Sequence, residues 1–414
     1  MKPYPSYKDS GVEWIGEIPS HWDNSKIKYE TVVPVQYGIN ISSESYVDEG
    51  IRFIRTTDIT DDGKILDKGV YLKPDFVEEI YKTKRNDLLI SRSGTLGRTY
   101  HHRVEDELTY GGYLVRFNFG NDKKSRFVFY FTKSKNFEDW LSLNTIQSTI
   151  GNVNGQKYSN LSLPFPTKSE QKQIVSFLDH KTQKIDELIE NTEQKIDLLK
   201  EKRTSLINHC VTKGLNPNVE MKDSGVEWIG EIPSGWGFPK VRYITSIEYG
   251  NSLKEEDRID GEYDVYGSNG VVGKHHNSLT NGETIIIGRK GSYGKINLSQ
   301  NPCYPIDTTF SIEQKNTKHD IKWMFYGLGV LRLDSFTKDS SVPGINREEI
   351  YERYLPLPPL PEQQQIVDYL DEQTQKIDST IEKETQRIEL LKEYRQSLIS
   401  EVVTGKIDVR DWKE

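Results

Sequence analysis

The chain has 414 residues, enough for two or three domains with cores of their own, and its formal net charge is -8 at pH 7. Cys210 and Cys303 are its only cysteines, no charged-then-apolar signal segment opens the chain, and no apolar run approaches the roughly 20 residues that cross a bilayer. We therefore expect a reduced, cytoplasmic, soluble protein, and the acidic balance argues against a basic protein that coats nucleic acid.

The first segment, residues 1–22, carries a phrase that the chain repeats. KDSGVEWIGEIPSHW runs from Lys8 to Trp22, and KDSGVEWIGEIPSGW runs from Lys222 to Trp236 with a single change. We interpret residues 215–236 as a linker followed by the second copy of this segment. The chain is therefore predicted to be a tandem duplication.

Residues 23–166 form the first variable block. Short strand-like runs alternate there with Gly and Asn turns, as in IRFIRTTDITDDGKI. Residues 23–165 carry 20 basic and 19 acidic side chains, so the block is close to neutral. We predict a β-rich α+β domain that would need a second protein in order to bind DNA firmly, because it carries little net positive charge.

Within this block, ISRSGTLGR (Ile90 to Arg98) places an RxGxxG pattern directly after the strand-like run DLLI. In a Gly-rich turn the backbone can approach a phosphate or a groove edge, which makes three side chains candidate DNA contacts: Arg92, Ser93 and Thr95. A tight turn with Gly at positive φ and an exposed Arg explains the pattern equally well. Thr56 and Thr57 are weaker DNA candidates, because Asp58 beside them can simply organise a turn.

Residues 167–214 have the period of a long amphipathic helix. Apolar residues step by 4, 7, 4, 7, 3 and 7 and draw one narrow stripe among Lys, Glu and Gln: Ile174, Leu178, Ile185, Ile189, Ile196, Leu199 and Leu206. Thr167 and Glu170 have capping-box spacing, and Gly214 stands where the pattern stops. A helix of about 40 residues would be on the order of 60 Å long.

Residues 237–361 form a second variable block, with 15 basic and 16 acidic side chains. Its sequence differs from the first, but IGRKGSYGK (Ile287 to Lys295) again sets RxGxxG after an apolar run. Two groups of side chains are candidate DNA contacts, one from this turn and one from GEYDVYGSNGVVGKHH: Arg289, Lys290 and Ser292, and Tyr266, Ser268, Asn269 and Lys274. Plain turns remain the alternative for both groups.

Residues 362–414 repeat the helix and add a tail. Segment 362–399 matches segment 170–207 at 24 of 38 positions without a gap. Pro361 suits a first helical turn, and Gly405 stands at the end of the pattern. The same stripe recurs at a constant offset of 192: Ile366, Leu370, Ile377, Ile381, Ile388, Leu391 and Leu398.

A long helix with so narrow a stripe needs a partner helix, and the other copy provides one. We predict an antiparallel pair that holds the two variable domains at a fixed separation. The predicted fold class is therefore α+β, with two β-rich domains separated by two long antiparallel helices in a pseudo-two-fold tandem repeat. A coiled coil that serves only for dimerisation is the alternative.

Other patterns suggest metal binding or catalysis but do not support it. His101–His102 and His275–His276 have no Cys or carboxylate at usual ligand spacing, so surface His residues are favoured over a metal site. NPCY (Asn301 to Tyr304) is similar to the Asn-Pro-Pro-Tyr/Phe motif of amino-methyltransferases but lacks the second Pro. A nuclease site is weaker still, because its acidic residues are closely spaced: Asp307 and Glu313, with Lys315. We expect neither a catalytic residue nor a metal.

In combination, these features resemble the specificity subunit of type I restriction-modification systems. The likeness rests on YKDSGVEWIGEIPSHW, DLLISRSGTLGR, YGSNGVVGKHH, LPLPPLPEQQQIVDYL and the doubled helices, and it covers essentially the whole chain. RxGxxG alone would be weak, whereas the ordered combination is specific. The resemblance implies two target recognition domains, residues 23–166 and 237–361, each reading one half of a bipartite asymmetric DNA sequence.

The resemblance also implies partners. The paired helices would space the recognition domains and dock two methyltransferase subunits, and two restriction/translocase subunits would complete the complex on double-stranded DNA. S-adenosylmethionine and ATP would be bound by these partner subunits, and the chain would have no cofactor of its own. The methyltransferase partners would also supply much of the phosphate clamp, so near-neutral domains could serve base discrimination.

Two other functions remain open. The chain could be a DNA methyltransferase or nuclease in its own right, which methyl transfer or cleavage by the purified chain would favour. It could also be a coiled-coil adaptor without DNA contact, which undiminished specificity after removal of both variable blocks would favour.

Overall fold

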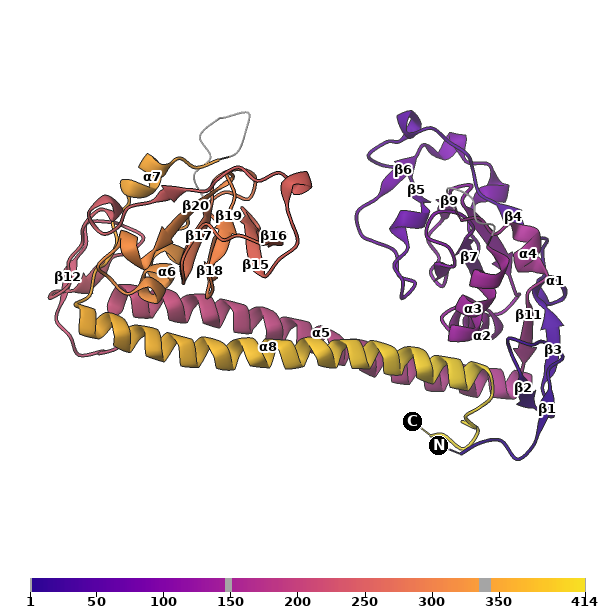
Figure 1. Ribbon diagram of the computed structural model, residues 1–414. Coiled ribbons are helices and arrows are strands. Elements are labelled where there is room, and N and C mark those ends of the chain that lie inside the picture. The colour runs from indigo at the N-terminus through magenta and orange to yellow at the C-terminus, as the bar shows by residue number, and fades with distance from the viewer. Residues whose placement is uncertain (1, 146–150, 335–343, 414) are drawn as a thin grey trace. The chain divides into compact units, whose positions relative to one another are not determined.

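The computed structural model describes residues 2–145, 151–334 and 344–413 (Figure 1). The chain divides into two compact units: unit 1 comprises residues 1–193 and 386–414, and unit 2 comprises residues 194–385. Each unit contains one hairpin, one variable domain and segments of two long helices, as a tandem duplication predicts.

In unit 1 the opening phrase forms a β-hairpin. Strands β1 (Tyr7–Asp9) and β2 (Glu17–Pro19) pair antiparallel, and the phrase ends on the fully buried Trp22. Strand β3 (Asp23–Lys26) then pairs antiparallel with β11 (Ser162–Phe165). The two chain ends of the variable domain therefore lie together, beside the hairpin.

Two sheets build this domain. The larger is antiparallel in the order β4-β10-β7-β8, and the smaller has the order β6-β5-β9 with β5 parallel to β9. Strand β7 is buried at every position, which explains why DLLI is an unbroken apolar run. The strands are β4 (Gln36–Tyr37), β5 (Ile51–Ile54), β6 (Val70–Leu72), β7 (Asp87–Ser91), β8 (Thr99–His101), β9 (Leu108–Tyr110) and β10 (Leu114–Asn118).

Four helices and four 3-10 turns complete the described part of this domain: α1 (Ile27–Glu30), α2 (Asp122–Phe131), α3 (Lys135–Asn144), α4 (Gly155–Ser159), η1 (Ser43–Ser45), η2 (Thr56–Asp58), η3 (Pro74–Phe76) and η4 (Glu79–Tyr81). Helices α2 and α3 begin where the side chains of Asn121 and Ser134 accept backbone N–H groups. Phe127 and Phe131 of α2 are fully buried in the core that the domain shares with the helix segments.

Unit 2 repeats this architecture. Strands β12 and β13 form the second hairpin, and the two sheets have the orders β14-β20-β17-β18 and β16-β15-β19, with β15 parallel to β19. The sheet orders of the two domains therefore correspond strand for strand. The strands are β12 (Met221–Asp223), β13 (Glu231–Pro233), β14 (Glu248–Tyr249), β15 (Tyr263–Gly267), β16 (Gly270–His275), β17 (Thr284–Gly288), β18 (Ile296–Ser299), β19 (Cys303–Pro305) and β20 (Thr309–Glu313).

The remaining described elements of unit 2 are short: α6 (Ile321–Gly329), α7 (Arg347–Tyr351), η5 (Val241–Tyr243), η6 (Glu255–Asp257) and η7 (Gln314–Asn316). Asn154 and Asn346, at matching positions of the two copies, cap α4 and α7 in the same way, since each side chain accepts a backbone N–H three residues on. The predicted domains 23–166 and 237–361 each include a segment outside the described residues, 146–150 and 335–343 respectively.

The two long helices are α5 (Lys168–Lys213) and α8 (Leu360–Val403), of 46 and 44 residues. The predicted capping box begins α5: Thr167 Oγ1 accepts the Glu170 N–H at 3.3 Å, and Glu170 accepts the Thr167 N–H at 3.3 Å. Gly214 and Gly405 follow the two helices with φ of 76° and 74°, a conformation that favours Gly. Helix α8 begins two residues before the predicted boundary, because Pro361 is tolerated in a first turn.

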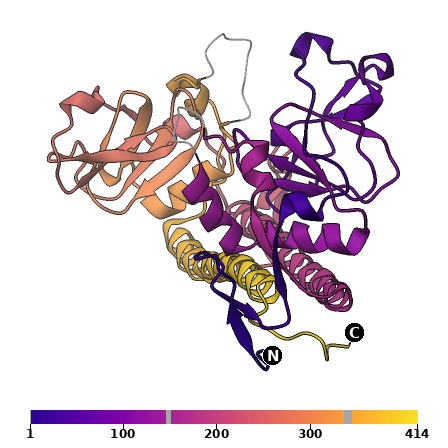
Figure 2. The same cartoon turned by 90° about the vertical axis from the view of Figure 1, so that its right-hand side faces the viewer.

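In each unit α5 and α8 lie side by side (Figures 1 and 2) and run antiparallel. In unit 1, Arg395 Nε bonds Asp186 at 2.8 Å, while Gln173, earlier on α5, bonds the backbone of Trp412, later in the chain. In unit 2 the ion pairs Lys195–Glu384 and Arg203–Asp378 run in opposite senses along the two helices. The predicted antiparallel pairing is therefore present within each unit.

All fourteen predicted stripe residues are buried or half-buried. Ile174 and Leu178 of α5 lie in the core of unit 1 together with Leu398 of α8, and Ile366 and Leu370 of α8 lie in the core of unit 2. Because each core contains residues of a variable domain as well as both helices, the helices pack against the domains and not only against each other.

Candidate nucleic-acid interface

The predicted DNA contacts of unit 1 come from two neighbouring loops, which follow β5 and β7. Element η2, with Thr56 and Thr57, follows β5, and the RxGxxG turn follows β7. The loops lie close together, because a Cβ added to Gly94 would come within van der Waals distance of Thr56 Oγ1, at 3.8 Å. Gly94 has a φ of 77°, which explains the Gly of the pattern. Asp58 is buried and accepts hydrogen bonds from the Arg55 backbone and guanidinium, so it organises the η2 turn.

Arg92 is half-buried and engaged by its own domain. Its guanidinium lies 5.0 Å from the ring centre of Tyr37 on β4, and its Nη1 donates to the Gly112 carbonyl at 3.2 Å. Ser93 beside it is only 8% exposed and forms a β-bridge with Asn152. Thr57 and Thr95 are exposed, so hydroxyl groups are what this part of the domain offers to a ligand.

Unit 2 contains the same construction. Arg289 lies 5.1 Å from the ring centre of Tyr249 on β14, and its Nη1 donates to the Asp307 carbonyl at 3.3 Å. Lys290 forms a β-bridge with Gly344, in the way that Ser93 bridges in unit 1. The side chains differ, since Lys290 is exposed where Ser93 is buried.

The second loop of unit 2 is the turn between β15 and β16. Ser268 is 9% exposed and donates to the Thr308 carbonyl at 2.8 Å, so its hydroxyl points into the domain. Asn269 is exposed, and both its Oδ1 and its carbonyl accept from Lys295 Nζ, at 2.9 Å and 2.8 Å. This contact joins the turn to the RxGxxG loop, where Ser292 is exposed.

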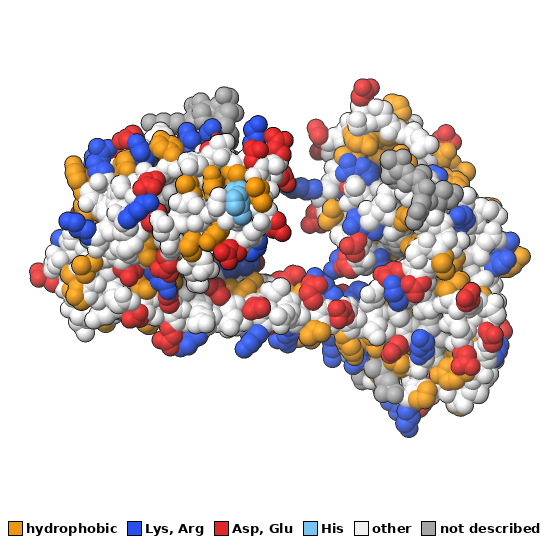
Figure 3. Space-filling view, in the orientation of Figure 1, with side chains coloured by type: hydrophobic (Ala, Val, Ile, Leu, Met, Phe, Trp, Pro, Cys, Tyr) orange, Lys and Arg blue, Asp and Glu red, His pale blue; other side chains and the backbone are white. Residues whose placement is uncertain are grey.

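The remaining predicted contacts of unit 2 lie on the strands themselves. Tyr266 of β15 is 9% exposed, so packing dominates its surroundings. Lys274 of β16 is exposed and lies 3.6 Å from the Asp264 carboxylate. On the surface shown in Figure 3, basic and acidic side chains intermingle in each unit, in keeping with the near-neutral charge counts.

Each copy of the repeated segment packs against the ends of both long helices. In unit 1 the indole of Trp22 donates to Glu170 near the start of α5 at 3.4 Å, and a Cβ on Gly405, after α8, would lie 3.2 Å from the same indole. In unit 2 Trp236 donates to Glu362 at 2.9 Å and meets Gly214 in the same way. Each copy of the phrase therefore binds the start of one helix and the end of the other.

Sequence reasoning missed a second repeated contact, which fastens each domain to its helices. Tyr130 Oη donates to Asp179 of α5 at 2.6 Å, and Tyr326 Oη donates to Asp371 of α8 at 2.7 Å. Burial raises the pKa of both phenols to about 12. The sequence did contain an indication of this contact, since Asp179 and Asp371 occupy equivalent positions of the two repeated helices, 192 residues apart.

A model of the type I restriction modification DNA specificity domain matches residues 19–200 and 233–392. The chain belongs to this family. The putative MjaX specificity subunit of Methanocaldococcus jannaschii is 22% identical over 96% of each chain, and the EcoKI specificity subunit of Escherichia coli K12 is 22% identical over 96% of this chain and 91% of its own. The MjaVIII specificity subunit of M. jannaschii is 25% identical over 69% and 71%.

Solved structures share the fold. A chain from a study of complex assembly and conformational transition of the type I R-M system has a TM-score of 0.73 at 14% identity, over 94% of this chain and 99% of that chain. The HsdS subunit from Thermoanaerobacter tengcongensis has a TM-score of 0.52 at 14% identity, over 94% and 98%. The protein is thus a type I specificity subunit, the non-catalytic subunit that recognises DNA sequence.

The residues of the specificity subunit that suggested metal binding or catalysis have structural roles. The prediction of surface histidines was wrong for three of the four, because His101, His102 and His275 are buried. Burial lowers the pKa of His101 to about 3, so this ring is neutral. Cys303 of the NPCY sequence lies on β19, and burial raises the pKa of its thiol. Glu313 pairs with Lys315 at 2.5 Å. Within residues 2–145, 151–334 and 344–413, no cluster of His, Cys, Asp and Glu could hold a metal, and no helix is long and apolar enough to cross a membrane.

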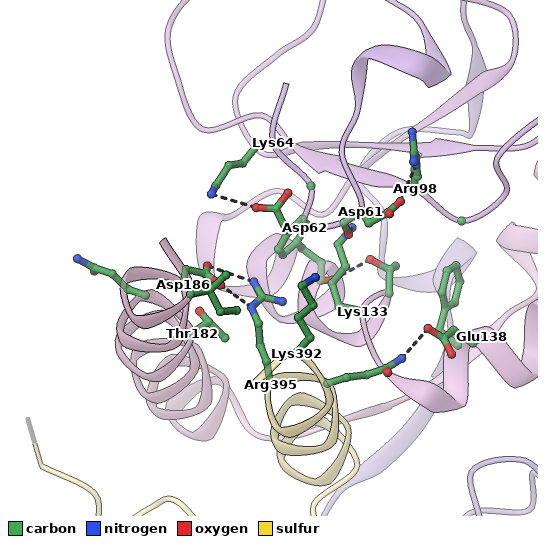
Figure 4. Close-up of a pocket in the computed structure, with 18 of the residues that line it drawn as sticks. Asp61, Asp62, Lys64, Arg98, Lys133, Glu138, Thr182, Asp186, Lys392 and Arg395 are labelled. Carbon is green, nitrogen blue, oxygen red and sulfur yellow. Dashed lines mark hydrogen bonds and ion pairs between the residues drawn. The ribbon is translucent and has the colours of Figure 1, made fainter. Parts of the chain in front are cut away.

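Unit 1 of the specificity subunit also contains a cleft of about 1220 Å³ between its domain and its helix segments (Figure 4). Charged groups that line it pair with one another: Arg98 with Asp61, Lys64 with Asp62, and Arg395 with Asp186. Lys133 Nζ donates to the Asp61 carbonyl at 2.9 Å and the Thr99 carbonyl at 3.3 Å, and burial lowers its pKa to about 7. These contacts lie within the domain or between the two helices, and Gln396 of α8 joins the two sides by donating to Glu138 of α3 at 2.6 Å.

Proposed function

We propose that the variable domains of unit 1 and unit 2 each read one half of a bipartite, asymmetric sequence in double-stranded DNA. One observation carries the proposal: two domains of corresponding topology share the same supporting contacts but expose different side chains at the same two loops. A common frame with unlike reading surfaces is what a target with two different halves requires. Thr57 and Thr95 of unit 1, and Asn269, Lys290 and Ser292 of unit 2, are the exposed loop candidates.

The proposal extends to the partners. The two hairpin segments pack against the long helices in the same way. Each hairpin segment and the adjoining helix ends therefore form one of two similar surfaces, which suits two methyltransferase subunits. Two restriction/translocase subunits would join them in the full complex. S-adenosylmethionine and ATP would be bound by those subunits. The methyltransferase subunits would also supply cations for the DNA phosphates, which the intermingled surface charge of this chain supplies sparingly.

DNA binding by the assembled methyltransferase complex tests this function. A labelled duplex with the methylated target is compared, at one fixed salt concentration, with duplexes in which one half or the other is scrambled. Scrambling either half should weaken binding roughly a hundredfold or more, because each lost base pair costs about 1–3 kcal/mol. Equal binding to all three duplexes would contradict the proposal. Methyl transfer by the purified chain alone would instead favour an independent methyltransferase.

A further inference from the structure

The Arg-on-Tyr pair of each domain is a support for the loops. Arg92 and Arg289 have ring distances of 5.0 Å and 5.1 Å and carbonyl distances of 3.2 Å and 3.3 Å, so their surroundings are nearly the same. Side chains placed identically in two domains cannot by themselves discriminate two different half-targets. Each guanidinium is also partly occupied by a ring face and a carbonyl, which leaves fewer donors for a base.

The residue after this Arg differs between the domains in both chemistry and exposure. The backbone is held alike, because Ser93 and Lys290 form matching β-bridges with the segments that contain Asn152 and Gly344. Ser93 is 8% exposed, whereas Lys290 is exposed. The variable domain of unit 2 (residues 237–361, domain 2) therefore exposes an ammonium group where the variable domain of unit 1 (residues 23–166, domain 1) buries a small hydroxyl.

The neighbouring turn adds a second donor. Asn269 is exposed, and its Oδ1 already accepts from Lys295 Nζ at 2.9 Å. The acceptor of this amide is thus engaged, while its Nδ2 retains N–H groups for a ligand. The hydroxyl of Ser268 is turned inward to the Thr308 carbonyl. Lys290 lies close to this turn, because its backbone N–H and the Ser268 hydroxyl both donate to the Thr308 carbonyl, at 3.4 Å and 2.8 Å. Asn269 and Lys290 therefore present hydrogen-bond donors at one exposed edge of domain 2.

A donor edge favours one base in the major groove. Guanine presents two acceptors there, N7 and O6, whereas cytosine presents a donor and adenine presents one acceptor beside a donor. We propose, on the basis of the proposed function, that Lys290 and Asn269 make domain 2 require a guanine in its half-site, and that Arg92 and Arg289 are positioning residues. Domain 1, which exposes Thr57 and Thr95 at the corresponding loops, reads its half by other contacts.

The test is to map methylated motifs by single-molecule sequencing in a methylation-free host that expresses the chain with its methyltransferase subunits. The half assigned to domain 2 should contain a guanine. Lys290→Ala should relax discrimination at that guanine roughly tenfold or more, as expected when a good base contact is lost, and leave the other half unchanged. Asn269→Ala should act on the same or the adjacent position. Lys318→Ala, at another exposed lysine of domain 2, is the matched control.

Arg289 is tested separately. Arg289→Gln should lower methylation while the motif stays the same, and Arg289→Lys should restore part of the loss, because a cation over Tyr249 is kept. A changed base requirement in Arg289→Gln would overturn the positioning role.

Other outcomes overturn the role of Lys290. A uniform loss of methylation with an unchanged motif would identify Lys290 as a phosphate contact. An unchanged motif and level, or a domain 2 half without guanine, would also refute the inference. Exchange of the whole block 237–361 separates this failure from that of the proposed function. If the block exchange changes one half but Lys290→Ala does not, only the inference fails, whereas an ineffective block exchange contradicts the function itself.

Discussion

Lengthening the paired helices should lengthen the unread gap between the two half-targets. We consider a four-residue insertion after Ile189 of α5 together with one after Ile388 of α8. Both points lie between the ion pairs that join the helices within the separate units, Asp186–Arg395 and Lys195–Glu384. Each unit therefore keeps its own ion pair, and only residues 190–193 and 386–388 of unit 1 are displaced from it. An inserted sequence of three polar residues followed by Ile continues the apolar stripe in both helices.

The size of the effect follows from helix geometry. Four residues add about 6 Å of length and about 1.1 turns, which leaves a net rotation of roughly 40°. Base pairs are spaced about 3.4 Å apart along each DNA strand, so the added length corresponds to about two base pairs. The expected result is a spacer longer by one to two base pairs, with both half-sequences unchanged.

Motif mapping of methylated bases in the host genome measures both quantities at once. A variant in which four existing exposed residues are replaced by the inserted sequence, without a change of length, is the control and should keep the original spacer. An unchanged spacer in the lengthened protein, with methylation intact, would refute the idea that the helices set the distance. Altered half-sequences would show that the helices also shape the reading surfaces.

Three further predictions concern stability. Tyr326→Phe removes the hydrogen bond to Asp371. Thermal unfolding should show that stability falls by only about 1 kcal/mol, because the carboxylate keeps its ion pair with Lys322 and is partly screened by solvent. An unchanged melting temperature would show that this bond does not hold the domain to its helix. Burial raises the pKa of the Glu170 carboxyl, but hydrogen bonds, among them those from His21 and Thr167, outweigh it and hold the pKa below the usual 4.5. This stabilisation is present above pH 4.5 and is lost as the pH falls through the lowered pKa. Glu170→Gln should therefore make the unfolding free energy, measured by denaturant titration, fall less steeply below pH 4.5. An unchanged pH dependence would show that Glu170 does not contribute this stabilisation. Gly405→Ala should lower the free energy of unfolding by about 1–3 kcal/mol, because the added Cβ would lie 2.4 Å from a proline ring carbon at a φ of 74°. Gly225→Ala is the control: its φ is 73° but it has no neighbour within 4 Å, so it should lose only about 1 kcal/mol through backbone strain. Equal losses in the two variants would refute the packing argument.

The parts of the fold that were predictable from sequence are those with a local period or a repeat. The stripe from Ile174 to Leu206 follows the helical period, and Gly214 and Gly405 take the positive φ that ends each helix. The duplication added long-range information, because a helix with a stripe and a matching partner is expected to pair with it. The antiparallel contacts Lys195–Glu384 and Arg203–Asp378 accord with that reasoning.

The reading surface was less predictable, because it depends on contacts between distant segments. Tyr37 lies 55 positions before Arg92, and nothing local to either residue shows that ring and guanidinium stack. The RxGxxG pattern therefore suggested an exposed Arg, whereas the structure engages it and exposes Lys290 in domain 2 instead. The sequence repeat could have revealed the contacts of Asp179 and Asp371, since both copies keep an acidic residue directly after an apolar stripe residue, where it lies half-buried and can bond a packed domain.

The most direct test of the central claim is an exchange of one domain. Residues 23–165 are replaced by the corresponding block of another specificity subunit with a known target, and methylated motifs are mapped in cells that also express the methyltransferase subunits. Our account predicts that one half of the motif changes to that of the donor, while the other half and the spacer remain. A change in both halves, or in neither, would contradict independent reading by two domains on a shared helical frame.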